Sequence, residues 1–290
     1  MVSVIIISYN TKGLTRKCLD QLSKSTGVEL EIIVVDNGST DGSAAEIEAA
    51  YPQVKVIRNK GNVGFGKANN QGMKMAKGEY FLLLNSDCFV EKTTVADLIK
   101  AMLAMPETGV AGCKLKNHDG SLQPSYGFFP TLFRIIMLML FIDNLPGVRR
   151  FFPSLHVRDP QRYTRVAKVD WVMGALMMIK REVYEKTGGF DENYFMYGEE
   201  VEWQYRIGQA GYQVKFIPQT SATHIGGASS PDKAPALLGE MDGWKYWFAK
   251  YFPGWKEQAL KFSVILGCQL RIWLKPKYAN FYREGIKKMK

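Results

Sequence analysis

Short runs of apolar residues, rich in Val, Ile, Leu and Phe, recur along the first third of the chain. They lie at residues 2–8, 30–36, 54–59 and 79–85. Runs of this length are typical of strands that are buried on both faces of a parallel sheet. Between them, leucines at helical spacing predict a helix over 11–25, and further helices are expected over 43–50 and from the Gly/Asn-rich turn 60–72 to about residue 77. This alternation predicts βαβ units.

The pattern is less regular in the second half of the chain. The expected elements are short strands at 110–115 and 121–126, a strand, a helix start and a turn within 169–192, a helix over 201–210 and a strand over 212–218. No internal repeat or low-complexity tract is present. For 290 residues, one α/β core with a smaller appendage is the expected organisation.

Two segments have the composition of a surface that meets lipid. Residues 131–142 are very apolar but shorter than the roughly 20 residues that span a bilayer. From Trp244 on, Lys and Arg alternate with Trp, Tyr and Phe, as in amphipathic helices at a membrane interface. A helical cap packed on the core, or a contact between two copies of the chain, would explain the same pattern. We therefore divide the chain into an α/β unit, 1–235, and a helical segment, 236–290.

The charge balance narrows the choice of partners. Lys and Arg number 38 against 28 Asp and Glu, a net charge of +10, which predicts polyanionic partners such as nucleic acid, anionic lipid or diphosphates. The basic residues concentrate near the C-terminus, whereas the predicted core carries acidic residues at its strand ends. This distribution disfavours nucleic acid and favours diphosphates and a membrane surface.

The cysteines and the N-terminus bear on the compartment. The four cysteines are scattered without a CxxC pair, and we expect them to be reduced: Cys18, Cys88, Cys113 and Cys268. The chain starts directly with an apolar strand and no basic leader, which predicts no signal peptide. Both features favour the cytoplasm.

Polar and acidic residues follow several of the apolar runs. Asp36 ends the second predicted strand, Asn85-Ser86-Asp87 follows the fourth, and His224 follows the last. Ligands bind at the carboxyl ends of strands in open α/β sheets. Carboxylates gathered there repel one another and need a cation, so we expect a metal-assisted site for a phosphate-bearing ligand.

The order of these motifs resembles the family-2 glycosyltransferases with a GT-A fold, and within them the rhamnosyltransferase-like branch that builds bacterial surface polysaccharides. The motifs are SYN, VVDNGSTDGS, NxGFGxANNxG, NSD, GGFDExYFMYGEE and HIGG, and the resemblance covers about residues 2–230. It implies an α/β, Rossmann-like GT-A fold: a mostly parallel central sheet flanked by helices, here followed by C-terminal amphipathic helices.

The resemblance implies donor contacts in the first half of the chain. Asp36 would accept a hydrogen bond from the N3–H of a pyrimidine, and Tyr9 would stack near the base. An Asx-turn before Gly38 and ordinary packing are the respective alternatives. Asn69 and Asn70 would lie near the ribose, unless this segment is only the first turn of a helix.

The NSD sequence stands where the family has its DxD motif. Its Asn85 leaves one carboxylate, so Asp87 is the expected ligand of Mg²⁺ or Mn²⁺, with Ser86 beside the donor. The resemblance gives His224 a metal or diphosphate contact, and Gly226-Gly227 would allow a mobile loop. His118 and His156 are expected to be surface residues.

The GEE sequence carries the expected chemistry. An inverting transfer needs a base for the acceptor hydroxyl, and Glu200 is assigned that role, with Glu199 orienting the acceptor. The two roles could be exchanged, or the pair could be a solvated helix start. Glu202 is expected to pair with Arg206 at i+4. By the resemblance, Asp170 and Trp171 are further acceptor-side candidates, with a core position as the alternative for Trp171, and Asp191 is a weaker one.

The expected activity is an inverting transfer of L-rhamnose from dTDP-L-rhamnose to a glycan on a polyprenyl diphosphate, at the inner face of the cell membrane. A UDP-hexose donor is the alternative. A sugar nucleotidyltransferase would carry a Gly-rich basic loop where SYNTKG stands, and a non-catalytic binding protein would spread its basic residues over the core. The sequence does not define the sugar, the linkage or the oligomeric state.

Overall fold

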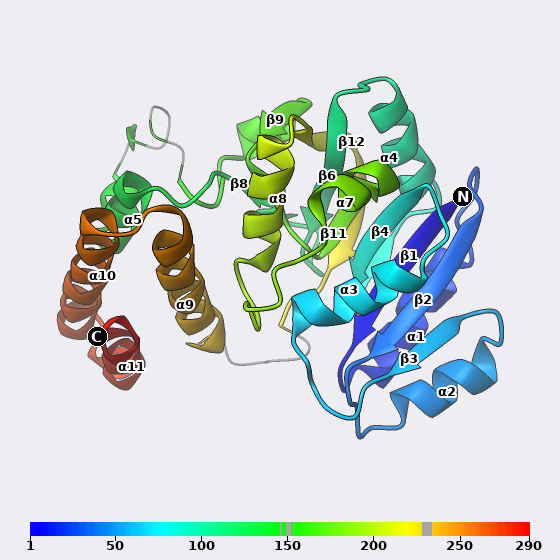
Figure 1. The fold of residues 1–290 in the computed structure, drawn as a ribbon, viewed down its shortest axis with the longest axis horizontal. Coiled ribbons are helices and arrows are strands. Elements are labelled where there is room, and N and C mark those ends of the chain that lie inside the picture. Colours follow the sequence, from blue (N-terminus) through cyan, green and yellow to red (C-terminus); the bar gives the residue numbers. More distant parts are fainter. Residues whose placement is uncertain (146, 149–151, 153, 228–233) are drawn as a thin grey trace.

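A computed structural model gives the structure, and it describes residues 1–145, 147–148, 152, 154–227 and 234–290, with the backbone alone at 144 and 234–237. Figure 1 shows a twisted central sheet flanked by helices and a separate group of helices on the other side of the molecule. The order of the sheet is β3-β2-β1-β4-β11-β6-β12-β5. No helix among these residues is long and apolar enough to cross a membrane.

The first four strands form the parallel half of the sheet. They alternate with three helices: β1 (Val2–Ser8), α1 (Lys12–Leu22), β2 (Leu30–Asp36), α2 (Ser43–Ala50), β3 (Lys55–Arg58), α3 (Phe65–Met75) and β4 (Tyr80–Asn85). β1 pairs in parallel with both β2 and β4, and β2 with β3. The predicted βαβ units are therefore confirmed, although α1 ends three residues earlier than expected.

The rest of the sheet is mixed. Its elements are β5 (Cys88–Val90), α4 (Thr94–Leu103), β6 (Thr108–Lys116), β7 (Leu122–Gln123), β8 (Tyr126–Gly127), η2 (Pro160–Tyr163), β9 (Ala167–Val169), β10 (Trp171–Val172), β11 (Leu176–Lys180), α7 (Arg181–Thr187), α8 (Glu199–Gln209) and β12 (Gln213–His224). β11 runs antiparallel to β4 and β6, while β12 runs parallel to β6.

The last strand is longer than the sequence predicted. We expected it to end at Pro218, but its register with β6 shifts between Ile217 and Ser221 and the strand then continues to His224. A proline is tolerated where a ladder is interrupted in this way. The continuation matters because β12 then pairs with β5, which places His224 opposite Cys88.

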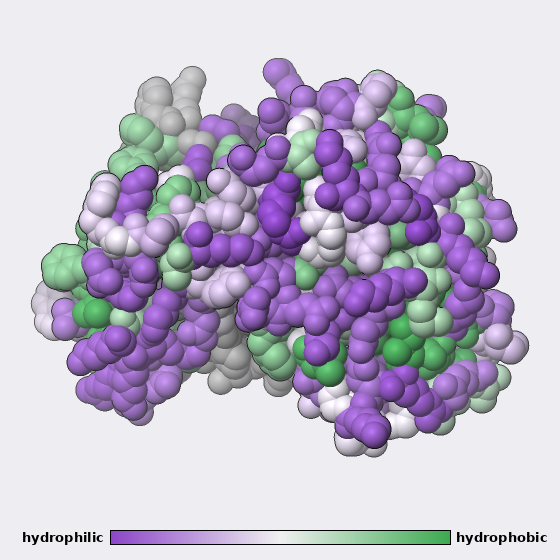
Figure 2. All heavy atoms as spheres, viewed as in Figure 1, coloured by the Kyte–Doolittle hydropathy of each residue, from purple (hydrophilic) through white to green (hydrophobic). Residues whose placement is uncertain are grey.

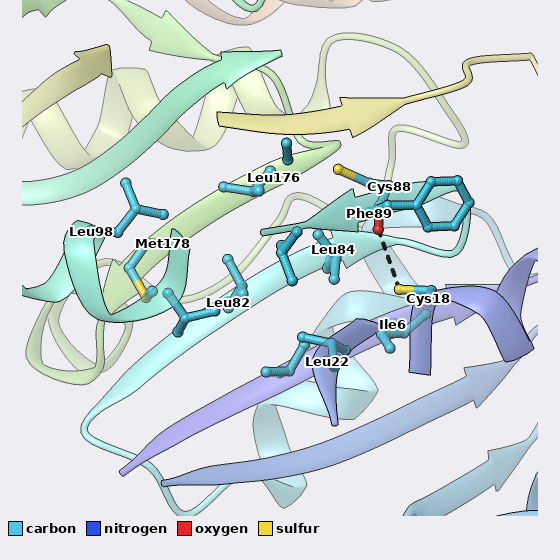
Figure 3. Close-up of a cluster of buried hydrophobic side chains, with 14 of the residues drawn as sticks. Ile6, Cys18, Leu22, Leu82, Leu84, Cys88, Phe89, Leu98, Leu176 and Met178 are labelled. Atoms are coloured by element: carbon cyan, nitrogen blue, oxygen red, sulfur yellow. Dashed lines mark hydrogen bonds between the residues drawn. The ribbon is translucent and has the colours of Figure 1, made fainter. Parts of the chain in front are cut away.

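The strands are apolar throughout because helices cover both faces of the sheet. Alternate residues of β4 point to opposite sides: Leu82 and Leu84 join the layer under α1 and α4, whereas Phe81 and Leu83 join the layer under α3, α7 and α8. Figure 3 shows the first layer, in which the thiol of Cys18 donates to the carbonyl oxygen of Cys88 at 3.3 Å. All four cysteines are buried and unpaired.

The remaining helices form a helical lobe with an apolar core of its own. The lobe comprises α5 (Leu132–Met139), η1 (Ile142–Asn144), α9 (Ala234–Tyr251), α10 (Trp255–Leu274), η3 (Pro276–Tyr278) and α11 (Ala279–Met289). α5 buries Ile135 and Met139 within this core, and α9 buries Trp247 and Phe248. Much of the apolar sequence that we expected at the surface is thus internal, because four amphipathic helices bury their apolar faces against one another.

Candidate active site

The carboxyl ends of β1, β2 and β4 lie on one line. The register pairs Ser8 with Asp36 and Ile7 with Asn85, so the residues that follow these strands share one edge of the sheet. Tyr9 follows Ser8 and is half-buried. The donor-side residues expected after the first, second and fourth strands are thereby brought together.

Asp36 is buried and has one oxygen to spare. Its Oδ1 accepts a hydrogen bond from the backbone N–H of Ser39 at 2.9 Å, so the turn that the sequence offered as an alternative does form. Its Oδ2 is buried without a hydrogen-bond partner in the described part of the chain. Such an acceptor costs about 1–3 kcal/mol when it is left unpaired, and the N–H of a bound base would satisfy it.

The turn after Asp36 is held tightly against the Gly/Asn-rich segment. Asn37 accepts hydrogen bonds from the Nδ2 of Asn59 and the backbone N–H of Val63, both at 3.1 Å. Gly38 has a φ of +83°, and a Cβ there would lie 2.5 Å from the Cα of Gly61. Only glycine allows this approach, which fixes the position of the turn beside Asp36.

Asn69 and Asn70 differ in their remaining hydrogen-bonding capacity. Asn70 donates to the carbonyl oxygen of Phe190 and accepts from its N–H, both at 2.9 Å. Its amide therefore joins α3 to the segment before α8. Asn69 donates to the carbonyl oxygen of Phe65, but its Oδ1 is buried and has no partner among the residues described. Of the two, Asn69 keeps an atom available to a ligand.

Ser86 belongs to a buried cluster of hydroxyl groups. Its Oγ lies 2.9 Å from the Oγ1 of Thr11, which lies 3.1 Å from the Oγ1 of Thr15. Ser8 joins the same cluster at 3.0 Å from Thr15. These contacts join the ends of β1 and β4 to the start of α1, and they fix the backbone that carries Asp87.

Asp87 and His224 face each other across the end of the sheet. The Oδ1 of Asp87 lies 3.3 Å from the Nε2 of His224, and its Oδ2 accepts from the N–H of Gly226 at 3.0 Å. Burial raises the pKa of Asp87, but the hydrogen bond and charge of His224 and the Gly226 N–H outweigh it and hold that pKa below its ordinary value. Asp87 is thus anionic at neutral pH.

The far side of the imidazole is oriented by Gln123. The Nδ1 of His224 lies 2.8 Å from the Oε1 of Gln123. Gln123 in turn donates from Nε2 to the Oδ1 of Asn117 at 2.9 Å, which fixes its amide orientation. Nε2 is then the ring nitrogen that faces Asp87, with the amide of Asn85 at 3.3 Å from the same atom. Metal-binding histidines are commonly oriented in this way.

This pair fits a divalent cation that also binds a diphosphate. A carboxylate oxygen and an imidazole lone pair 3.3 Å apart repel unless a proton or a cation lies between them. No group of three or more His, Cys, Asp or Glu that could hold a metal occurs in the described ranges. Asp87 and His224 would supply two ligands, and phosphate oxygens and water would supply others, which is the coordination that Mg²⁺ and Mn²⁺ accept. The glycines that follow His224 lead into residues 228–233, which lie outside the described residues.

Glu199 and Glu200 begin α8, after two residues with left-handed backbones. Tyr197 and Gly198 have φ values of +71° and +100°. Glu199 is 3% exposed, and its Oε2 has no partner within the described ranges. Burial raises the pKa of Glu199 well above its ordinary value, and the charge of Glu200 adds to this. A solvated helix start does not describe such a residue.

Glu200 is half-buried beside the turn that follows β10. A Cβ at Gly174 would lie 3.8 Å from the Cβ of Glu200. Burial raises the pKa of Glu200, Glu240 on α9 raises it further, and His156 opposes both. A carboxylate whose pKa is displaced upward in this way is a better proton acceptor than an exposed one.

His156 was expected at the surface, and its side chain is indeed 33% exposed, but it also makes contacts at the site that the sequence did not predict. Its ring lies edge-on to Trp171 at 5.2 Å, and its Nε2 is 3.6 Å from the Oε1 of Glu240. Burial lowers the pKa of His156, but Glu240 outweighs it and raises that pKa above the ordinary value. A backbone bridge to Gly127 brings this loop residue to the site. Only its residue type marked it as a candidate in the sequence.

The proposed acceptor residues have different surroundings. Trp171 is buried, and its indole N–H donates to the carbonyl oxygen of Phe128 at 3.1 Å. Asp170 accepts a hydrogen bond from the N–H of Phe129 at 2.7 Å. The structure brings the rings of Trp171 and His156 together, and Asp170 directly precedes Trp171 in the sequence.

Asp191 is bound to α9. Its carboxylate accepts from Lys250 at 2.7 Å and from Tyr246 at 3.0 Å. Burial raises its pKa, but these bonds, with those from Asn193, lower it to about 2. Glu202 pairs with Arg206 at 2.9 Å, as the i+4 spacing predicted, and it also accepts from Lys250.

The comparisons with known proteins agree with this arrangement. A family profile described as "Glycosyl transferase family 2" matches residues 3–188, and one described as "N-terminal domain of galactosyltransferase" matches residues 161–227. The N-acetylglucosaminyl-diphospho-decaprenol L-rhamnosyltransferase of Mycobacterium tuberculosis (strain ATCC 25618 / H37Rv) is 26% identical over 93% of this chain and 91% of its own length. The rhamnosyltransferase WbbL of Escherichia coli (strain K12) is 27% identical over 77% of this chain and 83% of its own length.

Solved structures share the fold. The mannosyltransferase PcManGT from Pyrobaculum calidifontis, in complex with GDP-Man and Mn²⁺, superposes with a TM-score of 0.58 at 16% identity. The match covers 99% of this chain and 83% of that one. At 16% identity, this similarity is evidence for the fold alone.

Proposed function

The chain belongs to glycosyl transferase family 2 and has the GT-A fold, and from this premise we propose that it is an inverting enzyme that moves L-rhamnose from dTDP-L-rhamnose to a glycan on a polyprenyl diphosphate. The observation that carries the proposal is the joint edge of β1, β2 and β4. A spare oxygen of Asp36 and the Asp87–His224 pair lie at this edge, and the carboxylates of Glu199 and Glu200 begin α8.

The donor side uses the unpaired atoms of the site. The Oδ2 of Asp36 would accept the N3–H of the pyrimidine, with Tyr9 near the base and the Oδ1 of Asn69 toward the ribose. Asp87 and His224 would hold Mg²⁺ or Mn²⁺ against the diphosphate, with Ser86 fixing the backbone between them. When bound, the cation offsets the charge of the diphosphate.

The transfer itself rests on Glu200. Its carboxylate takes the proton of the acceptor hydroxyl as that oxygen attacks the anomeric carbon. The bond from this carbon to the diphosphate breaks, and the nucleoside diphosphate leaves with the electron pair. Glu199 is too buried to meet bulk water, and its spare oxygen would orient the acceptor. Trp171, Asp170 and His156 lie on the acceptor side.

The assignment of the sugar and the acceptor is argued from the relatives. The two proteins described above carry rhamnosyltransferase names, and one of them names a diphospho-decaprenol acceptor. A lipid-linked acceptor would place the reaction at a membrane surface, on the inner face where nucleotide-sugars are found. The helical lobe would then be the part of the chain nearest the lipid.

A panel of nucleotide-sugars tests this function. We would incubate the protein with dTDP-L-rhamnose, UDP-hexoses and GDP-mannose, with Mg²⁺, Mn²⁺ or EDTA, and measure the nucleoside diphosphate that is released. The expected result is cation-dependent release from dTDP-L-rhamnose, increased by a polyprenyl-diphosphate-linked acceptor. Release from a UDP-hexose alone would mean that the donor is this UDP-hexose and not dTDP-L-rhamnose. If no donor reacted and no nucleoside diphosphate raised the melting temperature, which a ligand of the native state must do, the function would be wrong.

A further inference from the structure

The outer face of α10 carries a stripe of apolar side chains exposed to solvent. Trp255, Phe262, Leu266 and Trp273 are 71%, 68%, 42% and 78% exposed. Their spacing of seven, four and seven residues places them within about 40° of one another on a helix, along about 27 Å of its axis. We call these four residues the α10 stripe, and we propose that it docks the protein on an anionic lipid bilayer.

The α10 stripe is not part of the fold. The opposite face of α10 buries Leu260, Val264 and Cys268 in the core of the helical lobe. On that side α5 comes so close that a Cβ at Gly267 would lie 2.6 Å from the Cβ of Met139. The helix is therefore apolar on two faces, and the residues that the structure describes cover only one of them. Surface helices are ordinarily polar outside, and a large exposed apolar patch marks an interaction site.

The patch has the composition of a membrane interface. Two of the four residues of the stripe are Trp, which prefers the headgroup level of a bilayer, and Tyr278 lies exposed just past the end of α10. Figure 2 shows apolar atoms along the outer edge of the helical lobe, over the position of α10 in Figure 1. An interfacial helix of this kind lies in the membrane plane with its apolar face toward the acyl chains.

The charge of the lobe favours anionic lipid over a second copy of the chain. Residues 234–290 hold eleven Lys and Arg against four Asp and Glu, so they supply seven of the ten net positive charges of the chain. Lys256 adjoins one end of the α10 stripe, and Lys275 and Lys277 are exposed at the other. Basic residues close to an anionic membrane surface are attracted to it. Two copies paired through this face would instead bring like charges together.

Docking through α10 would also turn the acceptor side of the site toward the membrane. α9 lies between α10 and the sheet domain (Figure 1) and carries Glu240, which meets His156 beside Trp171. The acceptor side thus faces the same lobe that would meet the membrane. This step rests on the proposed function, because it assumes a lipid-linked acceptor that presents its sugar at the headgroup level. The docking itself does not depend on the proposed function.

Vesicle binding tests the proposal on the full chain. We would compare wild type with the triple variant Trp255→Gln, Phe262→Gln, Trp273→Gln, by co-sedimentation with vesicles of phosphatidylcholine alone or mixed with phosphatidylglycerol. Wild type should bind the anionic vesicles, and the triple variant should bind them at least about ten-fold more weakly, since each lost aromatic contact is worth more than 1 kcal/mol. The variant Lys256→Gln, Lys275→Gln, Lys277→Gln should lose the preference for phosphatidylglycerol.

Matched controls separate docking from folding and from catalysis. Met75→Gln with Leu103→Gln removes two exposed apolar side chains from the sheet domain, 46% and 65% exposed, and should leave vesicle binding unchanged. The triple variant should keep the melting temperature and its shift by dTDP. If it bound vesicles as well as wild type, the docking face would be wrong whether or not the chain transferred sugar. A wild-type dimer that the triple variant abolished, with no vesicle binding by either protein, would assign the stripe to a second copy.

Discussion

At the scale of single residues, the site is marked by oxygen atoms that are buried and unpaired. Asp36, Asn69 and Glu199 each keep one such atom, judged over the described ranges. Folded proteins pair nearly all buried polar groups because an unpaired one costs about 1–3 kcal/mol. Under the proposed function, the donor and the acceptor complete the hydrogen bonding of these three atoms. The neighbouring Asn70 shows the contrast, since its amide is fully engaged by Phe190.

The first prediction concerns the base of the nucleotide. Asp36→Asn keeps an oxygen for the N–H of Ser39 but can present an N–H where the pyrimidine N3–H needs an acceptor. We expect dTDP to bind about 10- to 100-fold more weakly, equal to about 1.4–2.8 kcal/mol, by isothermal titration. Asp41→Asn, in the same loop, removes a carboxylate that caps Ser43 and should leave dTDP affinity within about two-fold. Equal affinities for wild type and Asp36→Asn would remove Asp36 from the donor site.

The second prediction concerns the cost of burying Glu199. Its pKa is raised in the folded state, so the native protein holds a proton that the unfolded chain has released, and stability falls as pH rises from the unfolded value through the raised one. Glu199→Gln removes this loss. We expect its melting temperature to exceed that of wild type by about 2–4 °C near pH 8, the effect of about 1 kcal/mol, and by much less near pH 4.

A second glutamate serves as the control because its pKa is shifted in the opposite direction. Glu48 is exposed and Arg58 lowers its pKa, so Glu48→Gln should not stabilise the protein at the higher pH. A gain for Glu199→Gln that did not depend on pH would mean that packing, rather than the charge of Glu199, is responsible.

At the scale of elements, α9 holds the segment that leads to Glu199 and Glu200, the pair proposed to act in the transfer. Lys250 donates to both Asp191 and Glu202, and Tyr251 donates to Glu202 at 2.6 Å. α9 also packs closely against the left-handed turn before α8, because a Cβ at Gly243 would lie 2.6 Å from the carbonyl oxygen of Tyr197. Periodicity could predict that α9 is a helix but not which segment it holds.

The third prediction removes the link between α8 and α9. Lys250→Met leaves Glu202 buried with one cation fewer, which should cost about 1–3 kcal/mol of stability and loosen residues 190–198. Amide hydrogen exchange should then be faster in this segment, and turnover should fall with it. Lys245→Met is the matched control on α9, because Lys245 donates to the carbonyl oxygen of Lys288 on α11. Unchanged exchange at 190–198 would show that Lys250 does not position the glutamates.

Strands were predictable where burial on both faces left a clear pattern. β1 and β2 begin and end where the apolar runs do, and the acidic residues after them meet because parallel strands share a direction. The extension of β12 past Pro218 was not predictable, since it depends on its pairing with β6 and β5. Nor were β5 and α4 expected, although both pack in the core.

At the scale of the whole molecule, the sequence indicated a C-terminal helical segment but not how it divides its aromatic residues. Trp247 is buried and contacts Phe129 and Tyr205, while Trp255 and Trp273 are exposed on α10. Both groups have the same composition, so only the packing of the lobe separates them. His156 was missed for the same reason, because the lobe supplies its partner Glu240. A division of the chain at residue 235 stays a proposal.

The central claim is tested most directly by the turnover of Glu200→Gln, with dTDP affinity measured on the same protein. The account predicts that transfer to a polyprenyl-diphosphate-linked acceptor falls by about 10²- to 10⁴-fold, the contribution of a general base, while dTDP affinity stays within about two-fold. Turnover within ten-fold of wild type would contradict the role of Glu200, and a loss confined to Glu199→Gln would give the base to Glu199 instead.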